Sequence, residues 1–304
     1  MSKTRPTPFR AAFLALLGAC LFAASAAAQT TEWRGEAIVG VDYQGSTDID
    51  DPQGEFDFVH PFVSVRAGRR LGEDSRWSVA IGAEYRAFAY RFDGIGGLNV
   101  WDDIHIVRLA PRLSFAINRK WSLFAGPIGE FSGERGSDFS DAIRGGALFG
   151  AQWRPNDRFS IGLGVLGINA LADDFLLQPI LLIDWKITDR LTFSTQSWTS
   201  RGGTLSFTYA FDDGWETRLS GGRERERFRL DSPLAAIGKG IGEESSLPVT
   251  LSVGKILDSG IKVEAYGGGV FAGELRVEDQ TGDNVAVSDF GQSWFLGGAI
   301  TLPF

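Results

Sequence analysis

The chain alternates hydrophobic and polar positions with a period of two, and the pattern returns along most of its length. From Trp77 to Tyr85 every second residue is hydrophobic, and Glu84 and Arg86 fall on the opposite face. The same alternation recurs at 105–117, 177–186 and 205–211. Segments of about ten residues with one apolar and one polar or small face are typical of transmembrane β-strands, whereas strands of soluble sandwiches are about five or six residues long. The sequence therefore predicts an all-β fold, a transmembrane antiparallel β-barrel.

Short and long polar connections alternate between these segments. The short ones are 118–120, 155–157, 188–190, 212–214 and 258–260, with a looser one at 69–76. The longer ones are 46–55, 93–103, 133–141, 169–174, 230–246 and 278–289, and in this class only 200–203 is short. Short periplasmic turns and longer outer loops alternate in this way in outer-membrane barrels. The count predicts about 14 strands, or 12 if 200–203 and a neighbouring turn are misassigned.

Aromatic residues follow the short connections at one predicted depth. Four of the six residues placed there are Trp77, Trp121, Phe159 and Trp215. Amphipathic rings prefer the level of the lipid headgroups, so these positions predict an aromatic girdle. Composition agrees with a membrane location: 43% of residues are hydrophobic, with 39 glycines and 23 phenylalanines. No apolar run after residue 28 is long enough for a membrane-spanning helix.

The first 28 residues have the features of a secretory signal peptide. Lys3, Arg5 and Arg10 precede an apolar stretch, and Ala26–Ala28 supply the small residues of a cleavage site,. The single cysteine, Cys20, lies within this stretch, and the apolar residues after it favour ordinary cleavage over lipid attachment. We therefore expect residues 1–28 to be removed and residues 29–304 to form the barrel.

The other end of the chain resembles the C-terminal signal of bacterial outer-membrane β-barrels. Gly298, Ile300, Leu302 and Phe304 alternate up to a terminal aromatic residue. The resemblance implies recognition by the barrel assembly machinery. Together with the signal peptide it predicts the bacterial outer membrane, where lipid and lipopolysaccharide surround the protein.

A glycine pattern at 162–167, "GLGVLG", matches the G-x-G-x-x-G fingerprint of dinucleotide sites,. Such a site needs an amphipathic helix after the glycines, and here another β-pattern comes next. We therefore interpret Gly162, Gly164 and Gly167 as strand residues that let the wall curve and leave room for larger side chains in the lumen.

Charged residues on the predicted inner face form the candidate lumen lining. They are Glu84, Arg86, Arg108, Arg112, Glu130, Arg144, Asp184, Lys186, Arg218 and Glu264. Both signs occur in similar number. Either these side chains pair with one another and serve structure alone, or some line an aqueous path and set its charge preference.

Alternating arginines at 223–229 form the most unusual local pattern. Arg223, Arg225, Arg227 and Arg229 share one face, opposite Glu224, Glu226 and Phe228. If the register set by Trp215 continues, the arginines face outward, where they are candidates for contact with lipopolysaccharide phosphates. If Gly221 and Gly222 form a bulge, the faces exchange and the arginines line the pore mouth. A solvated, ion-paired strand end is the third interpretation.

Three segments resemble a family of uncharacterised bacterial outer-membrane β-barrel proteins. They are "RERERFRLD" (223–231), "GIGEESSLPVTLSV" (240–253) and "AYGGGVFAGELRVEDQTGDNVAVSDF" (265–290), followed by the terminal aromatic residue. The resemblance implies a barrel in the outer membrane and no particular reaction.

Catalytic and metal-binding patterns are weak. His60 and His105 could serve as bases near the outer leaflet, but no serine nucleophile motif accompanies them. The acidic loop 48–55 has no spacing that defines a calcium site. We therefore expect no enzyme activity, no cofactor and no metal.

The sequence predicts a passive channel or transporter for small solutes. The alternative is a non-conducting structural barrel that binds lipopolysaccharide or a partner through its loops and the strand at 223–229. An outer-leaflet lipid hydrolase is a more distant alternative. No feature suggests nucleic-acid binding, and a homo-oligomer is compatible with the pattern.

Overall fold

The computed structural model describes residues 33–50, 53–72, 75–94, 100–169, 171–172, 175–199, 202–231 and 239–304. The predicted signal peptide lies outside these residues. Within them, no helix is long and apolar enough to cross a membrane. The described chain is almost entirely β-strand, as the period of two predicts.

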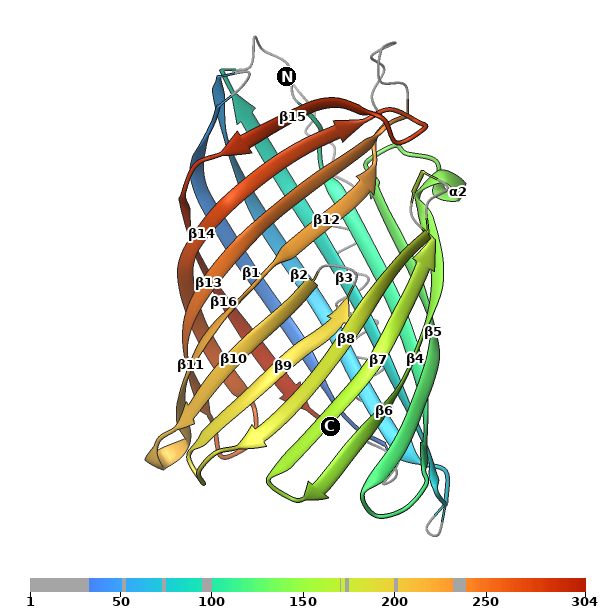
Figure 1. The fold of residues 1–304 in the computed structure, drawn as a ribbon. Coiled ribbons are helices and arrows are strands. Elements are labelled where there is room, and N and C mark those ends of the chain that lie inside the picture. The colour runs from blue at the N-terminus through green and yellow to red at the C-terminus, as the bar shows by residue number, and fades with distance from the viewer. Residues whose placement is uncertain are drawn as a thin grey trace, which may run out of the picture.

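Most successive strands pair as antiparallel hairpins (Figure 1). Their bounds are β1 (Arg34–Ile49), β2 (Gly54–Arg70), β3 (Trp77–Asp93), β4 (Ile104–Ala116), β5 (Trp121–Glu134), β6 (Ile143–Asn156), β7 (Phe159–Asn169), β8 (Phe175–Lys186), β9 (Leu191–Thr199), β10 (Gly202–Ala210), β11 (Trp215–Gly222), β12 (Glu224–Arg229), β13 (Ile241–Ile256), β14 (Lys262–Glu278), β15 (Asn284–Phe290) and β16 (Ser293–Pro303). The exceptions to this pairing are β12, which runs in the direction of β11, and β16, which runs in the direction of β15. A four-residue helix, α2 (Phe139–Ala142), precedes β6, and a 3-10 turn, η1 (Asp212–Gly214), precedes β11.

The wall is a closed barrel of fourteen strands, which confirms the predicted fold and strand number. Strands β1 to β11 pair in chain order, followed by β13, β14 and β16. Strand β16 then pairs with β1 from Glu36–Pro303 to Gln44–Phe295. The backbone of Phe304 continues this seam, because its N–H and C=O both bond to Gly35, at 2.9 and 2.8 Å.

The two ends of the barrel differ as the spacing of polar connections predicts. Short turns join consecutive strands at 117–120, 157–158, 187–190, 211–214 and 257–261. These turns lie with the C-terminus at the lower end of Figure 1. We call this the short-turn end and the opposite one the loop end. The connection 200–201 between β9 and β10 is also short.

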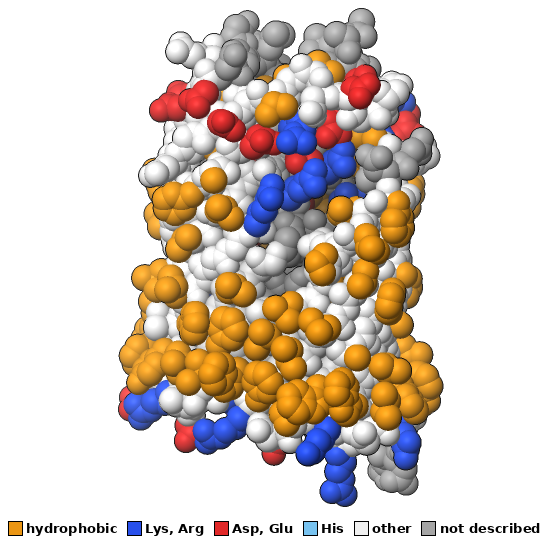
Figure 2. All heavy atoms as spheres, in the orientation of Figure 1, with side chains coloured by type: hydrophobic (Ala, Val, Ile, Leu, Met, Phe, Trp, Pro, Cys, Tyr) orange, Lys and Arg blue, Asp and Glu red, His pale blue; other side chains and the backbone are white. Residues whose placement is uncertain are grey.

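The outer face of the barrel is apolar, and the predicted faces of the strands are confirmed. Trp77, Ile81, Leu109 and Leu113 are exposed on β3 and β4, and the regular pairing of these strands places all four in the wall. On the face that Figure 2 shows, a band of hydrophobic side chains crosses the barrel, and charged side chains gather toward both ends. Exposed apolar surface of this extent needs lipid to cover it.

An aromatic girdle lies next to the short turns, where the sequence predicts it. Trp77, Trp121 and Trp215 are each almost half exposed, and Trp153 and Trp185 join them from β6 and β8. These rings are at the depth where amphipathic side chains reach the headgroup layer.

The glycine fingerprint lies within β7, so the nucleotide interpretation is excluded by a regular strand pairing with β6 and β8. Its role is close packing. A Cβ added at Gly150 on β6 would lie 2.4 Å from Cζ of Phe124, and one at Gly164 would lie 3.2 Å from the same atom. The two glycines therefore make room for a phenylalanine ring against the inner wall, as predicted.

Strand β12 leaves the line of β11 and changes the shape of the barrel. Strand β5 pairs with β6 only as far as Phe131–Ile143. Beyond that point its edge meets β12, with Gly133 opposite Arg229 in parallel, and the Ser132 hydroxyl donates to the Arg227 carbonyl at 2.7 Å. Within the described residues, the loop end is therefore a ring of nine strands, five from β1 to β5 and four from β12 to β15.

The interior of this narrower ring is filled with hydrophobic side chains, which we call the apolar roof. Its buried members are Ile49, Phe56, Phe58, Phe88, Phe92, Trp101, Ile104, Ile106, Phe228, Leu230, Val270, Leu275, Val277 and Phe290. A barrel of about eight strands is just wide enough for side chains to fill, whereas wider ones can enclose a cavity. The step from fourteen strands to nine thus closes the barrel at its loop end.

The wall is low where β9 and β10 stand, and Figure 1 shows both ending at mid-height. Strand β8 pairs with β9 only through residues 184–186. Between Phe175 and Leu182, β8 pairs with β7 on one side and with no described strand on the other. A second apolar cluster, which includes Phe124, Leu148, Leu166 and Ile180, covers the inner face of β5 to β8.

Three of the predicted loops are shorter than expected, and one of them is 230–246, because β13 already begins at Ile241. The connection predicted at 278–289 contains strand β15 and leaves only the turn 279–283. There the Asp279 carboxylate accepts hydrogen bonds from Thr281 and from the backbone N–H of Asp283, and the bond from Thr281 contributes most to holding the pKa of Asp279 below its usual value. The predicted loop 46–55 is mostly strand, because β1 extends to Ile49 and β2 begins at Gly54. Segments with the polar composition of loops thus extend the strand pairing beyond the apolar band.

Candidate functional site

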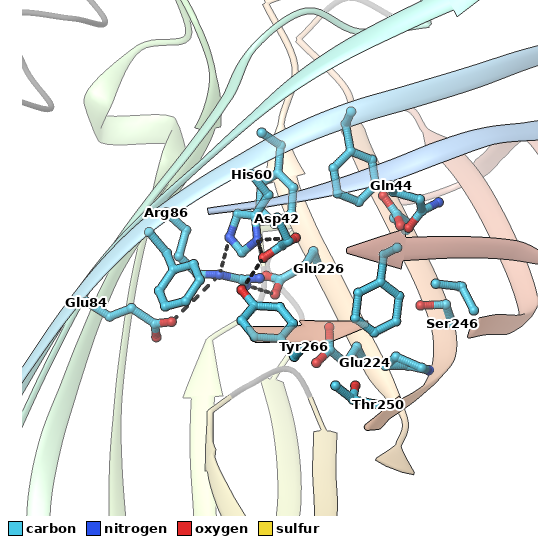
Figure 3. Close-up of a pocket in the computed structure, with 17 residues that line it drawn as sticks. Asp42, Gln44, His60, Glu84, Arg86, Glu224, Glu226, Ser246, Thr250 and Tyr266 are labelled. Atoms are coloured by element: carbon cyan, nitrogen blue, oxygen red, sulfur yellow. Dashed lines mark hydrogen bonds and ion pairs between the residues drawn. The ribbon is translucent and has the colours of Figure 1, made fainter. Parts of the chain in front are cut away.

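A cavity of about 290 Å³ lies inside the barrel, directly below the apolar roof, with which it shares Phe58, Phe88 and Val270. Figure 3 shows side chains from opposite sides of the barrel pointing into this cavity. The lining residues are Asp42, Gln44, Phe58, His60, Phe62, Glu84, Arg86, Phe88, Glu224, Glu226, Glu244, Ser246, Pro248, Thr250, Tyr266, Val270 and Phe295.

His60 is at the centre of the polar network on one wall of the cavity (Figure 3). Its Nδ1 lies 3.1 Å from both carboxylate oxygens of Asp42, and the Arg86 Nε donates to its Nε2 at 2.9 Å. Since an arginine nitrogen can only donate, Nε2 accepts and Nδ1 carries the proton given to Asp42. The Tyr266 hydroxyl donates to the same aspartate at 3.1 Å.

The opposite wall is the ribbon formed by β12 and β13. Glu226 and Glu244 stand directly opposite each other in the register, and Glu224 lies two residues along on the same face. The Arg86 guanidinium bonds to Glu226, and the Tyr90 hydroxyl donates to Glu244. The alternation at 223–229 therefore places its glutamates in the cavity and its arginines on the other face.

Four of the predicted lumen residues form a second ion-paired ladder beside the cavity. Arg108 lies 3.0 Å from Glu84 and donates its Nε to Glu130 at 2.6 Å. Arg144 bonds to the other oxygen of Glu130. Glu130, Arg108 and Arg144 are all buried. These side chains pair with one another, as the structural interpretation of the lumen charges predicts, although the Arg144 Nε is buried without a hydrogen-bond partner.

The other predicted lumen residues lie nearer the short-turn end. Arg112 packs its guanidinium 5.8 Å from the centre of the Phe124 ring. Asp184 and Lys186 are exposed on β8, opposite Ser194 and Thr192 of β9.

Arg218 and Glu264 belong to a cluster on β11 and β14. The Arg218 Nε donates to Thr208 at 3.2 Å, and its guanidinium lies 3.5 Å from Glu216. Lys262 lies 2.7 Å from Glu216 and also pairs with Glu264. The cluster is thus largely neutralised within itself.

The arginines at 223–229 face away from the cavity, so the interpretation in which the register continues is correct. Arg223 is exposed. Arg225 binds Glu243 through two bonds of 2.7 Å, and Arg227 lies 3.1 Å from the same glutamate. Figure 2 shows a diagonal row of blue Lys and Arg side chains on this face of the barrel, along the course of β12 in Figure 1.

Arg229 is a correction to the proposed lipopolysaccharide set. Its side chain is buried and donates to the carbonyl oxygens of Asp141 at 3.1 Å and Lys239 at 2.8 Å, and also to that of Leu171. It ties β12 to the loops around it and has no outer surface to offer to a phosphate.

The histidines do not form a hydrolytic site in this arrangement. Both ring nitrogens of His60 are engaged, by Asp42 and Arg86, so its lone pair is not available to a serine. His105 belongs to the opposite, outer face of β4 and lies 3.0 Å from the Tyr85 hydroxyl. Among the described residues no group of three or more acidic, histidine or cysteine side chains is placed to hold a metal ion.

Asp42, His60, Glu224, Glu226, Glu244 and Tyr266 line the cavity but are absent from the predicted lumen set. A local pattern could have placed Asp42, because Val39, Val41 and Tyr43 alternate with Gly40, Asp42 and Gln44. The glutamates of β12 share a face in the sequence, but their place in the cavity depends on the path of the strand.

The fold and the cavity define a class of protein: a transmembrane β-barrel with an apolar exterior, a charged interior and one constricted end. Within that class the chain belongs to the family described as a domain of unknown function, DUF6268, whose model matches residues 62–295. The match covers β3 to β15 and the second half of β2, and it leaves out β1 and most of β16.

One relative is an uncharacterized protein of Chlamydia muridarum (strain MoPn / Nigg). It is 25% identical over 188 residues, which are 62% of this chain and 56% of that protein. The chain therefore spans little more than half the length of this curated relative.

The solved structures that resemble the barrel include a channel and a transporter. A FadL homologue of Pseudomonas aeruginosa matches with a TM-score of 0.49 and 14% identity, over 91% of this chain and 92% of that one. An outer membrane channel from Pseudomonas putida F1 matches with a TM-score of 0.48 and 10% identity, over 90% and 95%. The toluene transporter TodX of P. putida has a TM-score of 0.41 and 9% identity, over 92% of each chain. At these scores the likenesses carry no argument about a transported molecule.

Proposed function

We propose that the protein is an outer-membrane channel or transporter for small solutes, exported with residues 1–28 as its signal peptide. The observation that supports this best is the charged cavity inside the barrel, whose fourteen-strand wall has an apolar exterior. Inward charges and a lipid-facing apolar surface are the combination that carries a polar path through a membrane. The proposed role is passage and not catalysis.

The apolar roof determines how such a channel would work. Trp101 and Phe228 pack edge to face with their ring centres 5.0 Å apart, and both are buried. Because these rings fill the narrow ring of nine strands, the straight route along the barrel axis is closed at the loop end. Conduction along the axis therefore requires the roof to move, and we expect the wild-type protein to be closed most of the time.

Single-channel recording in planar bilayers tests the proposal, with folding shown by heat-modifiable gel mobility. Phe228→Ala removes a roof ring and should give larger or more frequent conductance steps than wild type. Phe124→Ala is the matched control, since it truncates a buried phenylalanine of the second cluster and leaves the roof intact. A folded Phe228→Ala protein that stays silent, like the control, would overturn the channel function.

A non-conducting barrel that binds lipopolysaccharide is the second candidate, and the outer arginines favour it. Arg223 is exposed and Arg225 is about one-third exposed on the outer face of β12. Guanidinium groups bind phosphates in a bidentate manner, although a phosphate must compete with Glu243 for Arg225. Lipid A should then raise the thermal stability of wild type and not that of the Arg223→Gln/Arg225→Gln variant. An equal effect on both proteins would count against this candidate.

A further inference from the structure

The cavity has an excess of negative charge. Among the described residues, five carboxylates line it, from Asp42, Glu84, Glu224, Glu226 and Glu244, and Arg86 is the one arginine or lysine. With all five carboxylates ionised, the formal charge of this lining is 1 − 5 = −4, and assigning Glu84 to Arg108 outside the cavity leaves −3. A chamber with low-dielectric walls and one dominant sign of charge concentrates ions of the opposite sign.

Two of these carboxylates face each other across one ribbon. Glu226 and Glu244 are direct cross-strand partners, an arrangement in which like charges repel. The Arg86 guanidinium reaches Glu226, whereas Glu244 receives a hydroxyl hydrogen from Tyr90, which carries no positive charge. A cation between the β12–β13 ribbon and the opposite wall would therefore relieve a repulsion that the protein's own groups only partly balance.

Aromatic rings form a large part of the remaining lining. Phe58, Phe62, Phe88 and Phe295 share the cavity with Tyr266. The faces of such rings attract cations that have given up their water. The cavity already holds one cation in this manner: the Arg86 guanidinium lies 4.8 Å from the centre of the Phe88 ring while it bonds to Glu226.

We propose that this cavity binds a small organic cation, an ammonium compound whose nitrogen carries apolar groups. Carboxylates supply the charge, and aromatic rings cover the apolar groups. A bare divalent metal ion fits less well, because aromatic carbon offers it no ligands and the described residues contain no metal-binding group. The inference names the solute class of the proposed channel, and rests on that function only for how the cation enters and leaves.

Equilibrium binding to the full barrel in detergent micelles tests the inference without any need for transport. Isothermal titration with choline is compared with 3,3-dimethylbutan-1-ol, a neutral compound of the same shape. We expect choline to bind at least tenfold more tightly than the neutral compound. Equal binding of the two, or no binding of choline by protein whose folding is shown by heat-modifiable mobility, would overturn the inference.

Variants locate the site. Glu244→Gln and Glu224→Gln keep the shape and remove charge, and each should weaken choline binding about tenfold. The control is Glu274→Gln, because Glu274 lies outside the cavity lining and pairs with Arg276 at 2.6 Å. An equal loss in the control would place binding elsewhere and refute the site. A protein that binds choline but never conducts would uphold the site and reject the channel.

Discussion

Glu130 joins two buried arginines, so its charge should be among the most important for the stability of the barrel. Its side chain is fully buried, and those of Arg108 and Arg144 are 4% and 5% exposed. Glu130→Gln keeps the shape but removes the negative charge. Arg108 retains Glu84 at 3.0 Å, whereas the carboxylate that Arg144 bonds to within the described residues is that of Glu130.

The expected cost follows from leaving a charge buried without its partner. Removing one member of a buried ion pair costs about 3–5 kcal/mol, whereas an exposed pair is worth about 0–1 kcal/mol. The exposed pair Arg158–Asp189, with N–O distance 2.5 Å, supplies the matched control Asp189→Asn. We expect Glu130→Gln to lower the free energy of unfolding by about 3–5 kcal/mol, and Asp189→Asn by less than about 1 kcal/mol.

Urea unfolding of the refolded barrel in lipid vesicles, followed by tryptophan fluorescence, measures both. A double variant, Glu130→Gln/Arg144→Met, sharpens the test because it removes the isolated charge. It should be more stable than Glu130→Gln alone, despite carrying one more substitution. Two outcomes would refute this reasoning. One is an equal loss of unfolding free energy in Glu130→Gln and Asp189→Asn, and the other is a double variant that is less stable than Glu130→Gln alone.

Three further predictions address packing, the open edge and the seam. Gly150→Ala should lower the free energy of unfolding by about 1–3 kcal/mol, because its Cβ would lie 2.4 Å from Phe124. Gly82→Ala should be nearly neutral in the same urea assay, because the atom nearest to its Cβ would be 3.8 Å away. Amide hydrogen exchange should be faster in β8 than in β7, since β8 lacks a second described partner over most of its length,; equal protection would contradict the gap. Deletion of Phe304 should reduce the heat-modifiable barrel recovered from outer membranes, and Phe304→Tyr should retain it. Normal recovery after the deletion would reject the assembly signal.

The sequence predicts the wall of the barrel well because the wall obeys a local rule. Each strand must present apolar residues to lipid at every second position, so Trp77, Ile81 and Leu109 identify their faces without any knowledge of their neighbours. Turn lengths then supply the strand number. The glycines of β7 are also interpreted correctly, since the residues after them have the period of a strand and not of a helix.

The roof and the cavity depend instead on which edges meet, and no local pattern specifies that choice. Strand β5 exchanges its neighbour β6 for β12 within two residues, between Phe131 and Gly133. Strand β12 is remote in sequence, since Arg229 is 229 − 133 = 96 positions from Gly133. The one local hint is that the apolar outer face of β11 ends at Leu219, before two glycines and the run of arginines. Beyond Leu219 this strand has no apolar side chains to place against lipid, so lipid contact does not hold it in the wall.

The alternation of side chains along β12 connects the apolar roof with the charge of the cavity. One face of the strand carries Glu224 and Glu226 into the cavity and then Phe228 and Leu230 into the roof, while the arginines of the other face hold it to its surroundings. An inward displacement of β12 would bury more charge, and an outward one would withdraw Phe228 from Trp101 and break the three carbonyl bonds of Arg229. An open state that moves β12 therefore moves the carboxylates of the cavity and Phe228 of the roof together, so variants that displace β12 should change both the charge preference and the conductance of the protein.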